Sequence, residues 1–305
     1  MAKEWYETFK EMGKGKAFSV EHREFNATGT HNKTLTDDTI KIINNSNLVI
    51  AMTEYSATSS ILPICRAEGS ITRGVSMPLI ERRMENTAFK ANYQDVKKYA
   101  FAIEKMLNNA IGAKVNFSTG DNLYIDLRNR IAQTDAGDCT RYGQAINLPS
   151  GEAYKVPYEA TPDEIENYGK SKTEGVWPVM CDNELLKYVV ENNKIFKIIG
   201  RGKKADEMRS FFEENTSRKN IAELGIGCNP KAVVTGNPLE DEKVGLHIAY
   251  GMSTHIGGKV KSDIHIDIVH AKNCPTEGKT LILYHEDGSK TEIIRDSEIR
   301  YDLLK

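Results

Sequence analysis

The segment between residues 47 and 117 constrains the fold more than any other part of the chain, because short apolar runs alternate there with amphipathic segments. The apolar runs have the length of strands, and the segments between them have helical periodicity. The predicted order is strand 48–52, helix 58–68, strand 72–77, helix 94–109 and strand 114–117. Alternating strands and helices are typical of an α/β layer. The sequence therefore predicts an α/β fold for this half of the chain.

The C-terminal half has a different pattern. A segment between about 130 and 173 is rich in Gly, Pro, Asp and Tyr, as expected for loops that join two halves. Beyond it, helices are predicted at 183–191 and 204–214, and strands at 194–199, 220–226, 245–251, 263–269, 280–285 and 291–295. Since a domain has roughly 150 residues, a chain of 305 residues suits two domains. We predict an N-terminal α/β domain over 1–130, in which 1–46 are poorly defined, and a sheet-dominated C-terminal domain over 131–305.

Composition and charge exclude several classes of partner. The chain has 41 basic and 43 acidic residues and a net charge of −2, so no basic excess is available to neutralise a nucleic acid. The longest apolar runs are about five residues, far below the ~20 that span a bilayer. The first 16 residues lack the apolar core of a signal peptide, and the 5 cysteines include no CxxC pair. We therefore expect a cytoplasmic protein with reduced thiols that binds neither nucleic acid nor membrane.

The most informative segment is the predicted strand at 263–269. Side chains alternate between the two faces of a strand, so three isoleucines share one face and His265 and Asp267 share the other. The two polar residues are then about 7 Å apart at the backbone. Such a pair can converge on one metal ion, or it can form a solvated polar face with a hydrogen bond between imidazole and carboxylate.

Three further polar residues interrupt apolar, Gly-rich segments. His247 is flanked by small and apolar residues in a predicted strand, where it is either a ligand or a core or edge histidine. Glu223 is centred in an apolar strand, and burial of its carboxylate is costly unless it is paired or bound to metal. It could also face outward on an edge strand. Glu152 follows a Pro-Ser-Gly turn, which would expose its carboxylate at the start of a short strand.

The five residues together make three carboxylates and two imidazoles. This set suffices for two divalent ions about 3.5–4 Å apart, as in co-catalytic hydrolases. Gly225 and Gly227 match no phosphate-binding motif and are expected to let the backbone approach a site or another strand closely. His255 and His270 are candidates for proton shuttles or for donors that orient a metal ligand, or they lie on the surface.

The chain also resembles a known family. Segments 147–154, 222–230, 239–243, 247–251 and 265–267 are similar, in the same order, to segments of the aminopeptidase T/aminopeptidase S family of thermophilic metallopeptidases. The resemblance implies a cytoplasmic, dimeric enzyme with a C-terminal catalytic domain that binds two zinc, cobalt or manganese ions. This chain is shorter than typical members, so the resemblance implies a shortened, Rossmann-like N-terminal domain. The implied function is that of a leucyl aminopeptidase-like hydrolase, which removes N-terminal residues from peptides with a metal-activated water.

Residue by residue, the resemblance assigns roles to all five polar residues. Glu152 matches the carboxylate that bridges the metals, Glu223 matches the second glutamate, and both are candidate catalytic residues. The remaining metal ligands match His247, His265 and Asp267.

The sequence departs from the family at one functional position. Thr254 stands where the family has a tyrosine, so a phenol that holds metal or stabilises an oxyanion is missing unless Tyr142, Tyr154 or Tyr250 replaces it.

A second branch of the same superfamily gives a competing interpretation. The chain is also similar to 2,5-dihydroxypyridine ring-cleaving dioxygenases, which use one Fe(II). His247, His265 and Asp267 alone form the two-histidine, one-carboxylate triad that suits non-haem iron. Glu152 and Glu223 would then be acid/base or substrate-orienting residues. A third hypothesis is a binding protein that keeps the fold without activity.

Overall fold

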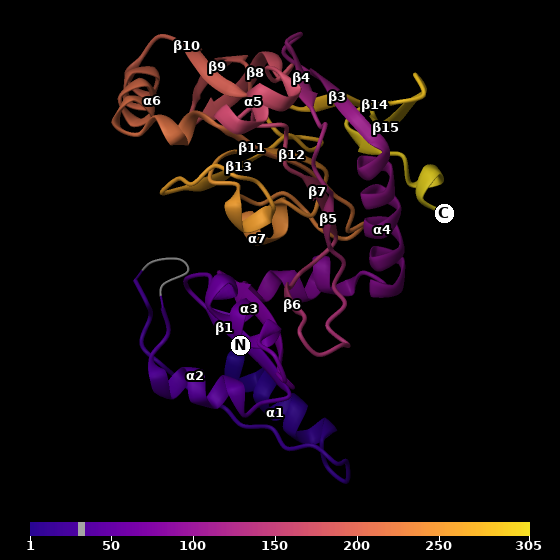
Figure 1. The fold of residues 1–305 in the computed structure, drawn as a ribbon. Helices are drawn as coiled ribbons and strands as arrows, with labels where there is room; N and C mark the ends of the chain where they lie inside the picture. Colours follow the sequence, from indigo (N-terminus) through magenta and orange to yellow (C-terminus); the bar gives the residue numbers. More distant parts are fainter. Residues whose placement is uncertain (30–33) are drawn as a thin grey trace. The chain divides into compact units, whose positions relative to one another are not determined.

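The computed structural model describes residues 1–29 and 34–305, which form two compact units. The small unit comprises residues 1–86 and 138–149, and the large unit comprises 87–137 and 150–305. The structure is mixed α/β, with 29% helix and 31% strand, which confirms the predicted fold class (Figure 1). Within the described ranges, no helix has the length and the apolar character needed to cross a membrane.

The small unit is built on a parallel sheet with the strand order β1-β2-β6. Helix α3 connects the first two strands, and Ile61 and Cys65 on it join Ile43 of α2 in a small apolar core. The strand–helix–strand order predicted from residue 47 onward is therefore confirmed. The elements of this unit are α1 (Ala2–Met12), α2 (Asp37–Asn44), β1 (Leu48–Thr53), α3 (Thr58–Arg66), β2 (Arg73–Pro78), the 3₁₀ helix η1 (Arg82–Asn86) and β6 (Ala145–Asn147).

The large unit contains two antiparallel sheets. One has eight strands in the order β10-β9-β8-β4-β3-β14-β15-β16, and the other has five in the order β13-β12-β11-β7-β5. The strands are β3 (Ala110–Phe117), β4 (Asn122–Asp126), β5 (Gln133–Asp135), β7 (Glu152–Lys155), β8 (Glu174–Cys181), β9 (Glu184–Glu191), β10 (Lys194–Ile199), β11 (Ile221–Gly227), β12 (Leu246–Gly251), β13 (His265–Val269), β14 (Gly278–His285), β15 (Lys290–Arg295) and β16 (Glu298–Ile299). The helices are η2 (Ala88–Lys90), α4 (Tyr93–Asn109), α5 (Pro162–Tyr168), α6 (Lys203–Glu214), η3 (Thr216–Lys219), α7 (Pro238–Asp241), η4 (Thr254–Ile256) and η5 (Tyr301–Leu304).

Residues from both sheets of the large unit share one apolar core. Trp177 of β8 packs edge-on against Tyr250 of β12, with their ring centroids 6.1 Å apart. Leu224 and Ile226 of β11 belong to the same core. Because side chains alternate along a strand, Glu223, Gly225 and Gly227 of β11 face the opposite side of the sheet. That opposite face carries the polar residues described below.

The units divide the chain differently from the predicted boundary after residue 130. Helix α4 and strands β3 and β4 precede that boundary but belong to the large unit. Strand β3 pairs with β14, which lies more than 160 residues further along the chain, as in the pair Ala113 and Leu283. Conversely, residues 138–149 follow the boundary and belong to the small unit, where β6 pairs with β2. Local periodicity in the sequence cannot predict pairings between strands that are this far apart in the chain.

The helix predicted at 183–191 is wrong, because this segment forms strand β9. Its side chains alternate between buried and more exposed positions, with Leu186, Tyr188 and Val190 buried. A two-residue turn at Asn192 and Asn193, both with positive φ, connects β9 to β10. Asparagine tolerates this backbone conformation and favours such hairpins. The alternation and the turn outweigh the helix-forming residues of the segment.

Candidate metal centre

Four adjacent strands of the five-stranded sheet bring the sequence-predicted residues to one face. Glu152 begins β7, Glu223 lies on β11, His247 lies on β12, and His265 and Asp267 lie on β13. All five have a cross-strand partner that is Gly or Ala, which leaves room above the sheet. The pairs are Glu152 with Gly227, Glu223 with Ala249, His247 with Gly225, His265 with Gly251, and Asp267 with Ala249.

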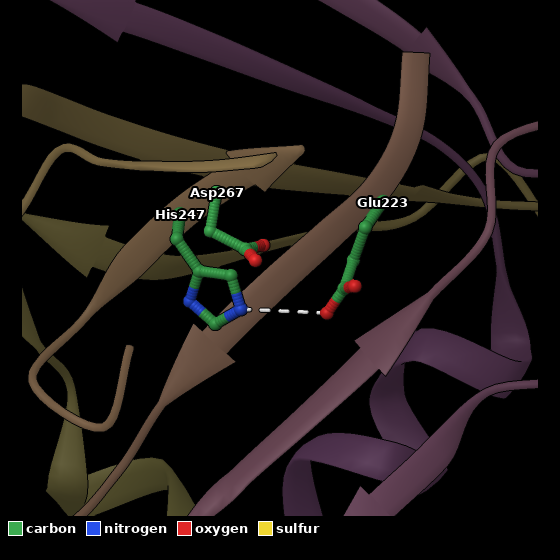
Figure 2. A group of neighbouring side chains, drawn as sticks. All are labelled: Glu223, His247 and Asp267. Atoms are coloured by element: carbon green, nitrogen blue, oxygen red, sulfur yellow. Dashed lines mark ion pairs between the residues drawn. The ribbon is translucent and has the colours of Figure 1, made fainter. Parts of the chain in front are cut away.

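The five side chains form a continuous series of close contacts. Nε2 of His247 lies 3.5 Å from Oε2 of Glu152 and 3.4 Å from Oε1 of Glu223. Nε2 of His265 lies 3.2 Å from Oε2 of Glu223 and 3.5 Å from Oδ2 of Asp267. Glu223, His247 and Asp267 each offer one ligand atom within 4.8 Å of the other two, and Figure 2 shows these side chains directed into a common space. The structure therefore brings together all five residues that the sequence singled out.

This donor set fits divalent metal ions. Ligand atoms that hold one ion at about 2.0–2.2 Å in tetrahedral geometry lie roughly 3.3–3.6 Å from each other. The contacts of 3.2–3.5 Å within the cluster are close to this spacing. In addition, Oε2 of Glu152 is buried and has no hydrogen-bond partner among the described residues. Carboxylates and imidazoles are the ligands that zinc, iron and manganese sites use.

The backbone orients one of the two imidazoles. Nδ1 of His265 lies 2.6 Å from the carbonyl oxygen of Met252, an acceptor only, so Nδ1 carries the proton and donates it. Nε2 is then the ring nitrogen that is available to bind a metal ion, and it faces Glu223 and Asp267. A hydrogen bond of this kind is typical of histidine ligands, because it fixes the tautomer and the ring orientation.

The electrostatics of the cluster favour positive charge at its centre. Burial lowers the pKa of His247, but Glu223 and Glu152 outweigh this effect and raise the pKa to about 9. Burial likewise lowers the pKa of His265, and Asp267 and Glu223 raise it well above its usual value. Burial raises the pKa of Glu223, whereas the two imidazoles hold that pKa far below the usual range. Glu223 therefore stays ionised, and the cluster attracts cations.

A buried lysine that is not among the predicted site residues completes the site. Lys243 is fully buried, and its Nζ donates to Oε1 of Glu152 at 2.6 Å and to Oε2 of Glu242 at 3.2 Å. Burial lowers the pKa of Lys243, but the two glutamates raise it well above the usual value. Burial also raises the pKa of Glu242 to about 8. The signal in the sequence was the charged segment 239–243, whose lysine lies outside any strand or regular helix.

Two glycines allow these groups to approach the sheet. A Cβ atom at Gly225 would lie 1.8 Å from Nε2 of His247. A Cβ atom at Gly227 would lie 2.2 Å from the carbonyl oxygen of Glu242. Gly225 and Gly227 therefore do what the sequence predicted, because they permit close approach of a site residue and of the backbone beside Lys243.

The remaining candidate histidines lie at different depths. His255 on η4 is exposed, and its ring stands perpendicular to that of His265, with the ring centroids 4.6 Å apart. His270 is fully buried, where its Nε2 accepts a hydrogen bond from Nε1 of Trp177 at 2.7 Å and its Nδ1 donates to the carbonyl oxygen of Thr276 at 2.5 Å. Both ring nitrogens of His270 are thus engaged in the core, which indicates a structural role.

The tyrosines that could replace a phenol at Thr254 also differ in position. Tyr154 lies two residues after Glu152 on β7, and it is paired with Gly225 on the face that carries the cluster. Tyr250 points into the core, where it packs against Trp177. Tyr142 belongs to the small unit. Of the three, Tyr154 therefore has its side chain on the same face of the sheet as the five donors.

Comparisons with known proteins agree with the resemblance at the level of the fold. No model of a protein family matches the sequence, and no curated protein sequence is significantly similar to it. The fold is shared with 2,5-dihydroxypyridine dioxygenase from Pseudomonas putida KT2440, with a TM-score of 0.63, 18% identity, and coverage of 95% of this chain and 83% of the other. It is also shared with wild-type AmpT from Thermus thermophilus, with a TM-score of 0.57, 13% identity, and coverage of 87% and 79%. These two structures represent both branches of the resemblance.

Proposed function

We propose that the protein is a metal-dependent hydrolase that removes N-terminal residues from peptides, with two divalent ions of zinc, cobalt or manganese as cofactors. The observation that carries this proposal is the position of Glu223. Its two carboxylate oxygens face two different imidazoles, Oε1 toward His247 at 3.4 Å and Oε2 toward His265 at 3.2 Å. A carboxylate in this position suits a bridge between two ions, one held with His247 and the other with His265.

The donor atoms divide accordingly between the two ions. His247 lies on one side of Glu223, and His265 and Asp267 lie on the other. The resemblance implies that Glu152 is the bridge, but the ion pair with Lys243 engages one of its oxygens. The geometry therefore favours Glu223 as the bridge. Two divalent ions supply Lewis-acid chemistry, since they make water nucleophilic near neutral pH and polarise a carbonyl.

Glu152 is the best candidate for the general base. Lys243 holds Oε1 of Glu152, while Oε2 is buried and has no hydrogen-bond partner in the described part of the chain. Oε2 can therefore accept a proton from the attacking water and deliver it to the leaving amine. The buried ammonium of Lys243 orients this carboxylate. We further propose a cytoplasmic homodimer that acts on peptides or small molecules and does not bind nucleic acid.

A second function, that of a mononuclear Fe(II) ring-cleaving dioxygenase, is favoured by two observations. The ammonium of Lys243 already neutralises Glu152, which reduces the need for a second cation. Glu223, His247 and Asp267 lie close enough together to hold a single ion. In this alternative, Glu152 acts on a hydroxylated N-heterocycle or aromatic as an acid or base.

Metal content distinguishes the two functions. Untagged protein purified without oxygen is analysed for its metals and is then assayed with leucine p-nitroanilide and, for oxygen uptake, with 2,5-dihydroxypyridine. About two equivalents of zinc, cobalt or manganese per chain together with anilide hydrolysis support the hydrolase. About one equivalent of iron together with oxygen uptake overturns it in favour of the dioxygenase. No bound metal and none taken up on titration favours a binding protein.

Two variants connect the metal to the named residues. His265→Ala removes a ligand and is expected to abolish metal loading and turnover, so retention of both would contradict the assignment. Glu223→Gln removes the charge of the proposed bridge and is expected to reduce the stoichiometry from two ions to one. Asp263→Asn is a matched control, because Asp263 is adjacent to β13 in sequence but pairs with Arg218.

A further inference from the structure

Strand β13, which carries two of the five donors, is the last strand of its sheet. The sheet order ends at β13, and among residues 1–29 and 34–305 only β12 pairs with it. Its register with β12 is regular over all five residues, without a bulge. Its residues are half-buried. One long side of this strand is therefore available for pairing, and edge strands with a regular backbone readily accept another strand.

The hydrogen bonds of the β12–β13 ladder show which residues face the open edge. The N–H of His270 donates to the carbonyl oxygen of Leu246, and the N–H of Met252 donates to that of Ile264. In an antiparallel pair the bonded residues alternate, so the even-numbered residues of β13 face β12. The N–H and C=O groups of His265, Asp267 and Val269 point to the open edge. In the described part of the chain none of these groups has a backbone partner.

We propose that an extended peptide binds along β13 as an added antiparallel strand, with backbone hydrogen bonds to His265, Asp267 and Val269. This inference rests on the proposed function and deepens it, because it names the substrate as a peptide chain of several residues. Recognition through backbone groups is independent of the peptide's sequence, as in other cases of strand addition. Side-chain preference would then be limited to the residue at the metal centre.

The substrate is favoured as occupant because the edge and the donor cluster share residues. His265 and Asp267 direct their side chains into the cluster and their backbone groups to the edge. A peptide paired with them is therefore held beside the groups that act on it. Because β13 has five residues, a peptide of about five residues makes every available hydrogen bond, whereas a shorter one makes fewer.

The test is the effect of backbone N-methylation on turnover by the metal-loaded full-length protein. The probes are a pentapeptide with N-terminal leucine followed by alanines, and the same peptide N-methylated at one position at a time. Methylation removes an N–H donor. Methylation at each of the alternate positions whose N–H faces β13 should therefore lower kcat/KM about five- to tenfold. The positions between them should change less than twofold. The pentapeptide should also exceed the dipeptide in kcat/KM.

A variant provides a second measurement. Val269→Pro removes an N–H that faces the edge but none that bonds to β12, and proline is tolerated at such positions. It should lower the ratio of pentapeptide to dipeptide kcat/KM at least threefold, whereas Val269→Ala, which keeps the N–H, should not. If leucine p-nitroanilide is hydrolysed but N-methylation shows no alternation and chain length has no effect, strand addition is overturned and the proposed function stands. If the protein, loaded with two ions, hydrolyses neither the anilide nor the peptides, the proposed function itself fails.

Discussion

Nε2 of His247 lies 1.8 Å from the place where a Cβ atom of residue 225 would be, so this histidine can occupy its position only above a glycine. Gly225→Ala should displace the imidazole, because the backbone of β11 is fixed by pairing on both sides. We expect a loss of about 1–3 kcal/mol in the free energy of unfolding and a metal affinity at least tenfold weaker. Urea unfolding and metal titration measure the two effects.

Gly245→Ala is the matched control for this prediction. Gly245 immediately precedes β12, and a Cβ atom there would meet Ala271 at an ordinary 3.4 Å. This variant should bind metal like the wild type. Equal metal affinity in both variants would show that the space above Gly225 is not required.

The ion pair between Lys243 and Glu152 provides a prediction about stability. Lys243→Met leaves the buried carboxylate of Glu152 without its cation, which should cost about 3–5 kcal/mol in metal-free protein. The double variant Lys243→Met/Glu152→Gln should recover most of this loss, because the unpaired charge is gone. Unfolding is measured in chelator and then with excess metal, where the cost should be smaller. A single variant as stable as the wild type in chelator would contradict the pairing.

The lowered pKa of His270 should make the free energy of unfolding depend on pH in the acid range. Burial lowers its pKa from 6.5 to about 4, so the unfolded chain binds more protons than the folded one between these values. The contribution of His270 is complete above pH 6.5 and is lost as the pH falls to 4, a change of about 3 kcal/mol. His270→Gln keeps a donor for Thr276 and an acceptor for Trp177 but does not titrate. Denaturant unfolding at pH 7 and pH 4 should therefore show a smaller difference for the variant than for the wild type.

The sequence identified the residues of the cluster better than it identified their surroundings. Glu223, His247, His265 and Asp267 interrupt apolar strands, and strand alternation predicted correctly that the last two share a face. That all four share one face with Glu152 depends on the antiparallel register of β7, β11, β12 and β13. Register between strands is set by long-range pairing, which a local pattern does not contain.

The two features that the sequence did not predict, the buried Lys243 and the placement of residues 138–149, both depend on contacts that are distant in sequence. Lys243 follows the short helix α7, and its backbone lies against β11 at Gly227, where a Cβ atom would clash with it. Residues 138–149 belong to the small unit because β6 pairs with β2, although a loop composition surrounds them. In both cases the decisive contact joins parts of the chain more than 10 residues apart, where helical and strand periodicities carry no information.

A buried carboxylate, Glu159, accepts hydrogen bonds from the segment between β12 and β13. Its oxygens accept from the backbone N–H of Lys259 at 2.7 Å and of Val260 at 3.3 Å, and from the hydroxyl of Ser253. It also pairs with Arg130 at 3.0 Å. The same segment carries η4, whose His255 packs against His265. Glu159 therefore anchors the segment that borders the donor cluster.

Glu159→Gln should loosen this segment, because an amide offers one acceptor oxygen where the carboxylate offers two. We expect a loss of about 1–3 kcal/mol in the free energy of unfolding and faster hydrogen exchange of the amides of Lys259 and Val260. Asp163→Asn is the control, since Asp163 contacts the same segment through the exposed Nζ of Lys259 at 2.7 Å and not through its backbone. Exchange measured by mass spectrometry on overlapping peptides across 253–262 should change in the first variant alone. Because none of the five donors is altered, metal content should remain that of the wild type, and unchanged exchange in Glu159→Gln would show that the segment is held by its own turns instead.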